Sequence, residues 1–119
     1  AQRVAAHEFS ISALAGSLLQ YGKQGISLHF GKKRVGCPDG RIVVGMPLHE
    51  IIWQARNQAL HWEDGEFHPS TATCFENLAA NADPVFGQYK HRSLAYEIIS
   101  LLGWKSPNAF HQDMLLFDV

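Results

Sequence analysis

The chain has 119 residues, which is the length of one domain and not of two. Hydrophobic residues make up 46% and charged residues 18%, a composition that can bury a core and argues against a disordered chain. The formal net charge of -1 argues against tight, sequence-independent binding of nucleic acid by a basic monomer surface, although a local basic site is compatible with it.

The cysteines and the apolar runs lead us to expect a cytoplasmic protein that does not enter a membrane. Cys37 and Cys74 lie far apart and form no CxxC pair, so reduced thiols are the default, and a single bridge between them stays open. No apolar run reaches the roughly 18 residues of a membrane span. The first 20 residues lack a clean apolar block and do not resemble a signal peptide. No initiator methionine is present, and we expect either a trimmed product or a domain of a longer protein.

Spacing predicts a first helix over about Val4 to His29. Its apolar stripe consists of residues that recur at three- and four-residue steps: Phe9, Ala13, Leu14, Leu18 and Tyr21. Three glycines weaken it, each by about 1 kcal/mol relative to alanine: Gly16, Gly22 and Gly25. Because glycine lets a neighbouring helix come close, we expect the second half of this helix to be bent or tightly packed.

The stretch "GKKRVGCPDGRIVVGMP" breaks the helical pattern with four glycines and two prolines. Pro38-Asp39-Gly40 is a turn signal flanked by "RV" and "RIVV", which predicts a long loop or a small β-hairpin. The stretch is also the most basic part of the chain, through Lys32, Lys33, Arg34 and Arg41. Two interpretations stay open for these cations: a solvated loop, or a contact with a phosphate backbone.

The second predicted helix, from about Pro47 to Glu63, is the clearest amphipathic helix of the chain. Pro47 suits the first helical turn, and Gly65 is a stop signal. Apolar residues follow with helical spacing: Leu48, Ile51, Ile52, Ala55, Ala59 and Trp62.

Three further helices are predicted downstream. The third begins at Ser70 or as late as Thr73, because Thr73 and Glu76 have capping-box spacing, and it ends before a break at residues 81–84. The fourth runs from about Gln88 to Leu102 and ends at Gly103. The last spans about Pro107 to Leu115 after the cap signal Ser106-Pro107. We therefore expect an all-α fold, an antiparallel up-and-down bundle of four to five helices in a single domain over residues 1–119.

The end of the second helix carries three polar residues whose chemistry suits phosphate. Asn57 and His61 are four residues apart and share a helix face, and the long side chain of Arg56 can lean toward the same anion. Cleavage of RNA without a metal needs proton transfer and neutralisation of the phosphate charge. Histidine suits the first task and arginine the second, and asparagine can orient either group.

The segment "RNQALH", Arg56 to His61, resembles the R-x(4–6)-H motif of the HEPN superfamily, in which a polar residue often follows the arginine, as Asn57 does here. The resemblance implies an up-and-down helical bundle and a metal-independent endoribonuclease with no cofactor. It also implies a composite site at a homodimer interface, RNA as substrate, and a toxin–antitoxin or defence context with a possible antitoxin partner. The implied roles are His61 as general acid/base, Arg56 as phosphate clamp and Asn57 as orienting group. The long basic loop before the motif is not a feature of the family pattern.

Other interpretations of these residues stay open. The polar set could be an ordinary solvated helix end, since cations favour a helix C-terminus. A weaker alternative treats His61, Glu63, Asp64 and His68 as metal ligands, although no helical H-x-x-x-H or E-x-x-H spacing is present.

A second basic cluster with an aromatic residue is "YKHR", in which Lys90 and Arg92 could contact RNA together with Lys32, Lys33 and Arg34. A non-catalytic helical interaction domain of a regulatory or defence protein is the alternative function for the whole chain.

Overall fold

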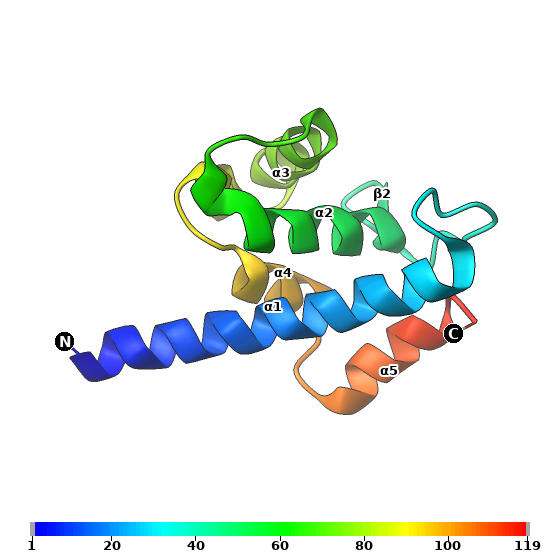
Figure 1. Cartoon of the computed structure of the whole chain (residues 1–119), viewed down its shortest axis with the longest axis horizontal. Helices are drawn as coiled ribbons and strands as arrows, with labels where there is room; N and C mark the ends of the chain where they lie inside the picture. The colour runs from blue at the N-terminus through cyan, green and yellow to red at the C-terminus, as the bar shows by residue number, and fades with distance from the viewer. Residues whose placement is uncertain (1, 119) are drawn as a thin grey trace.

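The computed structural model describes residues 2–118, and the side chains from residue 10 onward. Within that range the chain is mostly helical with one small sheet (Figure 1). The elements in chain order are α1 (Gln2–Phe30), β1 (Ile42–Val43), β2 (Met46–Pro47), α2 (Leu48–His61), the 3₁₀ helix η1 (Trp62–Asp64), α3 (Pro69–Asn81), the 3₁₀ helix η2 (Pro84–Lys90), α4 (Ala95–Leu102) and α5 (Pro107–Leu115).

Helix α1 is the longest element, and the other helices are arranged along it (Figure 1). Helix α2 lies against α1 and runs in the opposite direction, and α4 packs against both of them (Figure 1). Helix α3 packs on α2 and on η2, on the side of α2 away from α1. The all-α bundle predicted from the sequence, with a small hairpin between the first two helices, is confirmed.

The buried face of α1 differs from the apolar stripe that the spacing suggested. Leu14 and Tyr21 are 72% and 64% exposed, whereas the core side consists of Ala15, Leu19, Gly22 and Ile26. The side chain of Phe9 lies outside the described residues. The sequence carries two apolar stripes on this helix, and packing against α2 selects the one that contains Gly22. A Cβ atom on Gly22 would lie 3.3 Å from Cγ2 of Ile52, so the predicted tight approach occurs here.

The hairpin is present, but its turn lies later than the sequence suggested. Ile42 pairs with Pro47 and Val43 with Met46, in an antiparallel register. The turn residues are Val44 and Gly45, at φ values of +51° and +76°, the backbone of a two-residue turn that matches the twist of a hairpin. Pro38-Asp39-Gly40 instead forms part of the loop that leads into β1.

The fourth helix is shorter than predicted. The expected range from Gln88 to Leu102 is helical in the α sense only from Ala95, and the preceding residues form η2 and a turn. The buried side chain of Gln58 on α2 explains the interruption, because it bonds the backbone of this segment at Tyr89, Arg92 and Leu94. Backbone groups held by a side chain in this way are not available for a continuous α-helix.

The remaining boundaries agree closely with the sequence signals. Helix α5 begins at Pro107, and the hydroxyl of Ser106 accepts a hydrogen bond from the N–H of Ala109, as the cap signal predicted. Helix α2 ends at His61 and continues as one 3₁₀ turn to Gly65, whose φ of +74° stops it. Helix α3 begins at Pro69, close to the earlier of the two predicted starts.

No helix within residues 2–118 has both the length and the apolar character that a membrane span requires.

Candidate functional site

The three predicted site residues lie on the C-terminal half of α2. Arg56 and Asn57 are partly buried, and His61, the last residue of the helix, is exposed. The guanidinium Nη1 of Arg56 donates to Oδ1 of Asn57 at 3.3 Å, so these two neighbours are in contact. Adjacent residues on a helix can meet in this way because arginine is long and the helix is near its end.

His61 is oriented by an acid that follows it in the sequence. Its Nδ1 lies 3.0 Å from Oδ2 of Asp64, and the 3₁₀ turn over residues 62–64 brings the carboxylate back over the helix end. An ionised carboxylate can only accept, so Nδ1 carries the hydrogen, and in the neutral ring Nε2 presents a lone pair. Both side chains are more than half exposed, so the contact fixes geometry more than it adds stability.

The structure places Arg56 and His61 in two neighbouring depressions rather than in one. Arg56 lines a groove of about 500 Å³ between α1 and α2. The other residues that line this groove are Ala13, Gly16, Ser17, Gln20, Tyr21, Ala59 and Leu60. Asn57 and His61 line a second hollow of about 350 Å³ at the start of α3, together with Asp64, Glu66, Phe67, His68 and Thr71. The Arg56–Asn57 hydrogen bond links the two depressions.

Two residues of α1 that the sequence did not single out belong beside Arg56. Oε1 of Gln20 accepts from Nε of Arg56 at 2.6 Å. The pKa of Lys23 is lowered, first by burial and then by the charges of Arg56 and Lys32, so these three cations share one positive region. Only the rotation of α1 against α2 brings them together, and no sequence signal gives that rotation.

The charges around His61 have the opposite sign. The hollow that it lines contains the carboxylates of Asp64 and Glu66, and no lysine or arginine lines it. The negative charge of a phosphate bound at this position would therefore have to be compensated by the guanidinium of Arg56, in the adjacent groove. The positive charge beside the groove and the negative charge in the hollow result from the tertiary structure.

The predicted RNA-contacting cations fall into two groups that lie apart along the long axis (Figure 1). Lys32 and Lys33 are exposed in the turn after α1. Lys90 is exposed at the end of η2, with its Nζ 5.7 Å from the ring centroid of Tyr89, and Arg92 bonds Gln88 and Glu97. The fold thus does not bring the two clusters together.

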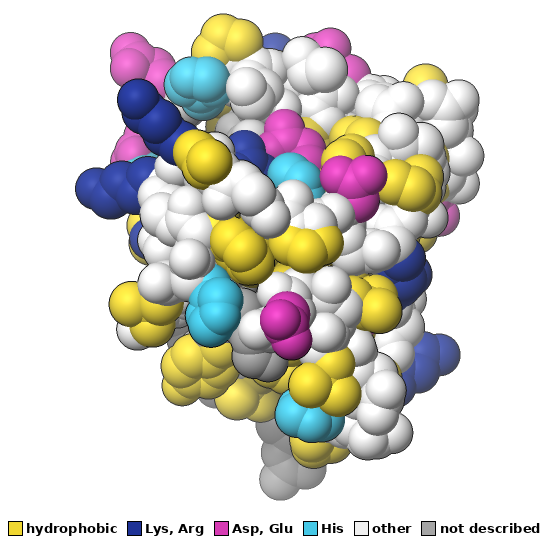
Figure 2. Space-filling view, turned by 90° about the vertical axis from the view of Figure 1, so that its right-hand side faces the viewer, with side chains coloured by type: hydrophobic (Ala, Val, Ile, Leu, Met, Phe, Trp, Pro, Cys, Tyr) yellow, Lys and Arg dark blue, Asp and Glu magenta, His cyan; other side chains and the backbone are white. Residues whose placement is uncertain are grey.

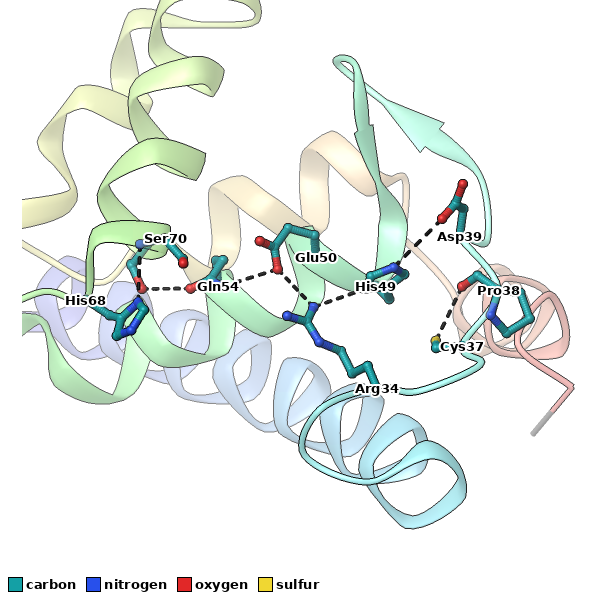
Figure 3. Close-up of polar contacts among 10 residues, drawn as sticks. Arg34, Cys37, Pro38, Asp39, His49, Glu50, Gln54, His68 and Ser70 are labelled. Carbon is teal, nitrogen blue, oxygen red and sulfur yellow. Dashed lines mark hydrogen bonds and ion pairs between the residues drawn. The ribbon is translucent and has the colours of Figure 1, made fainter.

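Arg34 is engaged within the protein. Its Nη1 lies 3.1 Å from Nδ1 of His49 and 2.8 Å from Oε1 of Glu50 (Figure 3). Its guanidinium carbon also lies over the ring of Trp53, 4.6 Å from the ring centroid. These contacts fasten the loop after α1 to the first turns of α2. On the face of the molecule at this end, lysine and arginine side chains lie mainly toward the edges and form no continuous basic patch (Figure 2).

The residues of the weaker metal interpretation do not form a metal site. Among the described residues, no three histidine, cysteine, aspartate or glutamate side chains are grouped so that they could hold an ion. His68 instead caps α3, where its Nδ1 accepts a hydrogen bond from the N–H of Ser70 at 3.2 Å (Figure 3).

Comparisons with known proteins leave the family undecided: no family model, no curated protein and no solved structure matches the chain.

Proposed function

We propose that the protein is a metal-independent endoribonuclease of HEPN type that acts as a homodimer. The observation that carries the proposal is the connected set on α2. Arg56 contacts Asn57, and one helical turn later His61 is held by Asp64, so that its Nε2 is a free proton acceptor. Such a set supplies a phosphate clamp, an orienting amide and an oriented base in two adjacent depressions along one helix.

In this reaction the 2′-hydroxyl of the substrate attacks the adjacent phosphorus. The 2′-hydroxyl proton passes to Nε2 of His61, a bond forms between phosphorus and the 2′-oxygen, and the bond from phosphorus to the 5′-oxygen breaks. The leaving 5′-oxygen takes a proton from the imidazolium of the second protomer's copy of His61. The products are a 2′,3′-cyclic phosphate and a 5′-hydroxyl, and exchange with water restores both histidines.

Apolar surface beside Arg56 supports the dimer. Tyr21 and Leu60 line the groove that contains Arg56 and are 64% and 59% exposed. Large exposed apolar side chains that lie together are typical of an interface. A twofold interface over this groove would bring a second Arg56 and His61 to the same cleft.

A second function is favoured by the carboxylates. Asp64 and Glu66 line the hollow of His61, and negative charge there opposes RNA. A non-catalytic interaction domain that uses the apolar groove would explain both this charge and the exposure of Tyr21 and Leu60. In this function the chain would be part of a regulatory or defence protein, and a binding partner would cover the groove.

Cleavage of single-stranded RNA in the presence of EDTA tests the proposal. We expect a 2′,3′-cyclic phosphate product, and a rate about 100-fold or more lower for His61→Ala, because general acid–base catalysis contributes at least that much. His111→Ala, an exposed histidine on α5, is the matched control and should cleave like wild type. Equal background cleavage by wild type and His61→Ala would refute the nuclease. Loss of self-association or partner binding in Leu60→Ala would then favour the interaction domain.

A further inference from the structure

A second imidazole lies in the hollow that His61 occupies. His68, at the start of α3, lines the same depression of about 350 Å³. The two residues are separated by the 3₁₀ turn and by a short connection, which fold the chain back so that both rings border one space. Both side chains belong to exposed residues, so a ligand can reach them.

Their hydrogen-bond partners give the two neutral rings opposite tautomers. Nδ1 of His68 accepts from the backbone N–H of Ser70, so the ring hydrogen resides on Nε2. Nδ1 of His61 faces the carboxylate of Asp64 and carries the hydrogen, so its Nε2 is bare. One ring therefore offers a donor at Nε2, and the other offers an acceptor.

Asn57 adds a second donor to the same hollow. Its Oδ1 accepts from Arg56, so its amide nitrogen keeps two hydrogens for other partners. The hollow thus combines two neutral donors, on Asn57 and His68, with one bare acceptor on His61. Asp64 and Glu66 make the hollow unfavourable for further negative charge. The donors of Asn57 and His68 are neutral, so they form no ion pairs with these carboxylates and stay available to a ligand.

This pattern matches one ribose hydroxyl beside one phosphodiester. We propose that His68 is a second catalytic residue, whose Nε2–H binds a non-bridging oxygen of the phosphate attacked in the reaction. The proposal rests on the ribonuclease function above and extends it. His68 breaks and forms no covalent bond: the 2′-hydroxyl proton goes to His61, and His68 stabilises charge on the phosphorane-like transition state through its hydrogen bond.

A purely structural role for His68 makes different predictions, because the residue also caps α3. Asparagine is among the strongest N-cap residues, and its amide nitrogen occupies the place of Cδ2 in histidine, one bond short of the position of Nε2–H. His68→Asn therefore keeps the cap and removes the donor at the Nε2 position, whereas His68→Ala removes both. Comparing the two variants separates capping from substrate contact.

The experiment uses the full chain, one single-stranded RNA oligonucleotide, and its uncleavable 2′-deoxy counterpart. We expect ¹⁵N NMR of the histidine rings to show hydrogen on Nε2 of His68 and on Nδ1 of His61. In His68→Asn we expect the unfolding midpoint of wild type and kcat/KM lower by about 10- to 100-fold, the range for a lost hydrogen bond to a charged group. The 2′-deoxy oligonucleotide, which keeps the phosphates, should bind His68→Asn more weakly than wild type.

The two proposals fail separately. If wild type cleaves, His61→Ala does not, and His68→Asn cleaves like wild type, His68 is only a cap and this inference is overturned while the nuclease stands. If wild type does not cleave, the nuclease is refuted, and the catalytic role of His68, which rests on it, is refuted with it. Hydrogen on Nδ1 of His68 would also overturn it.

Discussion

The side-chain oxygen of Gln58 accepts a hydrogen bond from the backbone N–H of Leu94 at 2.9 Å, across 36 positions of sequence. Nε2 of the same side chain donates to the carbonyl oxygens of Tyr89 and Arg92, at 2.8 and 2.7 Å. Gln58 is 0% exposed, so α2 holds the connection between η2 and α4 from inside the protein. The residue follows Arg56 and Asn57 directly on α2 and lies within one helical turn of His61, and it therefore joins the candidate site to the fold.

Gln58→Leu should lower the free energy of unfolding by about 3 kcal/mol. Three backbone groups lose their partner, and each buried polar group left unsatisfied costs about 1–3 kcal/mol before water compensates for part of it. Urea denaturation measures the change. Gln112→Leu, at an exposed position of α5, is the matched control and should change stability by no more than about 0.5 kcal/mol. Equal unfolding midpoints for the two variants would contradict a structural role of Gln58.

Gly40→Ala should destabilise the protein more than Gly36→Ala does. Both glycines have a positive φ, +79° and +78°, so alanine costs about 1–2 kcal/mol of backbone strain at either position. At Gly40 the new Cβ would also lie 2.9 Å from the ring of Phe117 and 3.0 Å from Leu48, which adds about 1–3 kcal/mol of overpacking. At Gly36 nothing lies within 4 Å. Thermal unfolding of both variants tests the difference, and a larger loss in Gly36→Ala would be inconsistent with the packing of this loop.

One thiol of the folded chain should react with a thiol reagent at pH 8, and two should react in urea. Cys74 is 2% exposed, and burial raises its pKa to about 12, which suppresses the reactive thiolate. Cys37 is partly exposed, and although burial raises its pKa, the charge of Arg34 opposes the rise. Cys37→Ser should abolish labelling of the folded protein. Both cysteines are free in the structure, so a result of no reactive thiol in urea without reductant would show a bridge and contradict it.

His49 should make the protein less stable as the pH falls below about 6.5. Burial lowers the pKa of His49, and the charge of Arg34 lowers it further, while Glu50 and Asp39 oppose the shift. The unfolded chain then binds a proton at a higher pH than the folded chain. Stability from neutral His49 is therefore complete above the ordinary value of 6.5 and declines as the pH falls toward the folded-state pKa.

His49→Gln isolates this contribution, because the two proteins differ only at this position and glutamine can still accept from Arg34. We expect the stability of wild type to fall more steeply than that of His49→Gln as the pH falls below 6.5, as measured by urea denaturation. Parallel curves would show that His49 is not held neutral by its surroundings.

The polar contacts of the candidate site were only partly predictable. The residue types and spacing of Arg56, Asn57 and His61 follow from the sequence, and so does their place at the end of α2. Whether Arg56 and His61 would face one depression did not follow, because that depends on what covers each side of the helix. Gln20 from α1 and His68 from the start of α3 entered the site only through the packing of those helices around α2.

The sequence by itself determined features that depend on neighbouring residues: the apolar periodicity of α2, the start of α5 at its Ser106 cap, and the stop at Gly65. Capping and helix periodicity act within a few residues, so their signals are local. Only the tertiary structure decided which stripe of α1 is buried, where α4 begins, and which depression each polar side chain of α2 lines. Each of these outcomes depends on contacts between distant segments, such as Gly22 with Ile52 and Gln58 with Leu94, whose free energy arises only when the helices pack together.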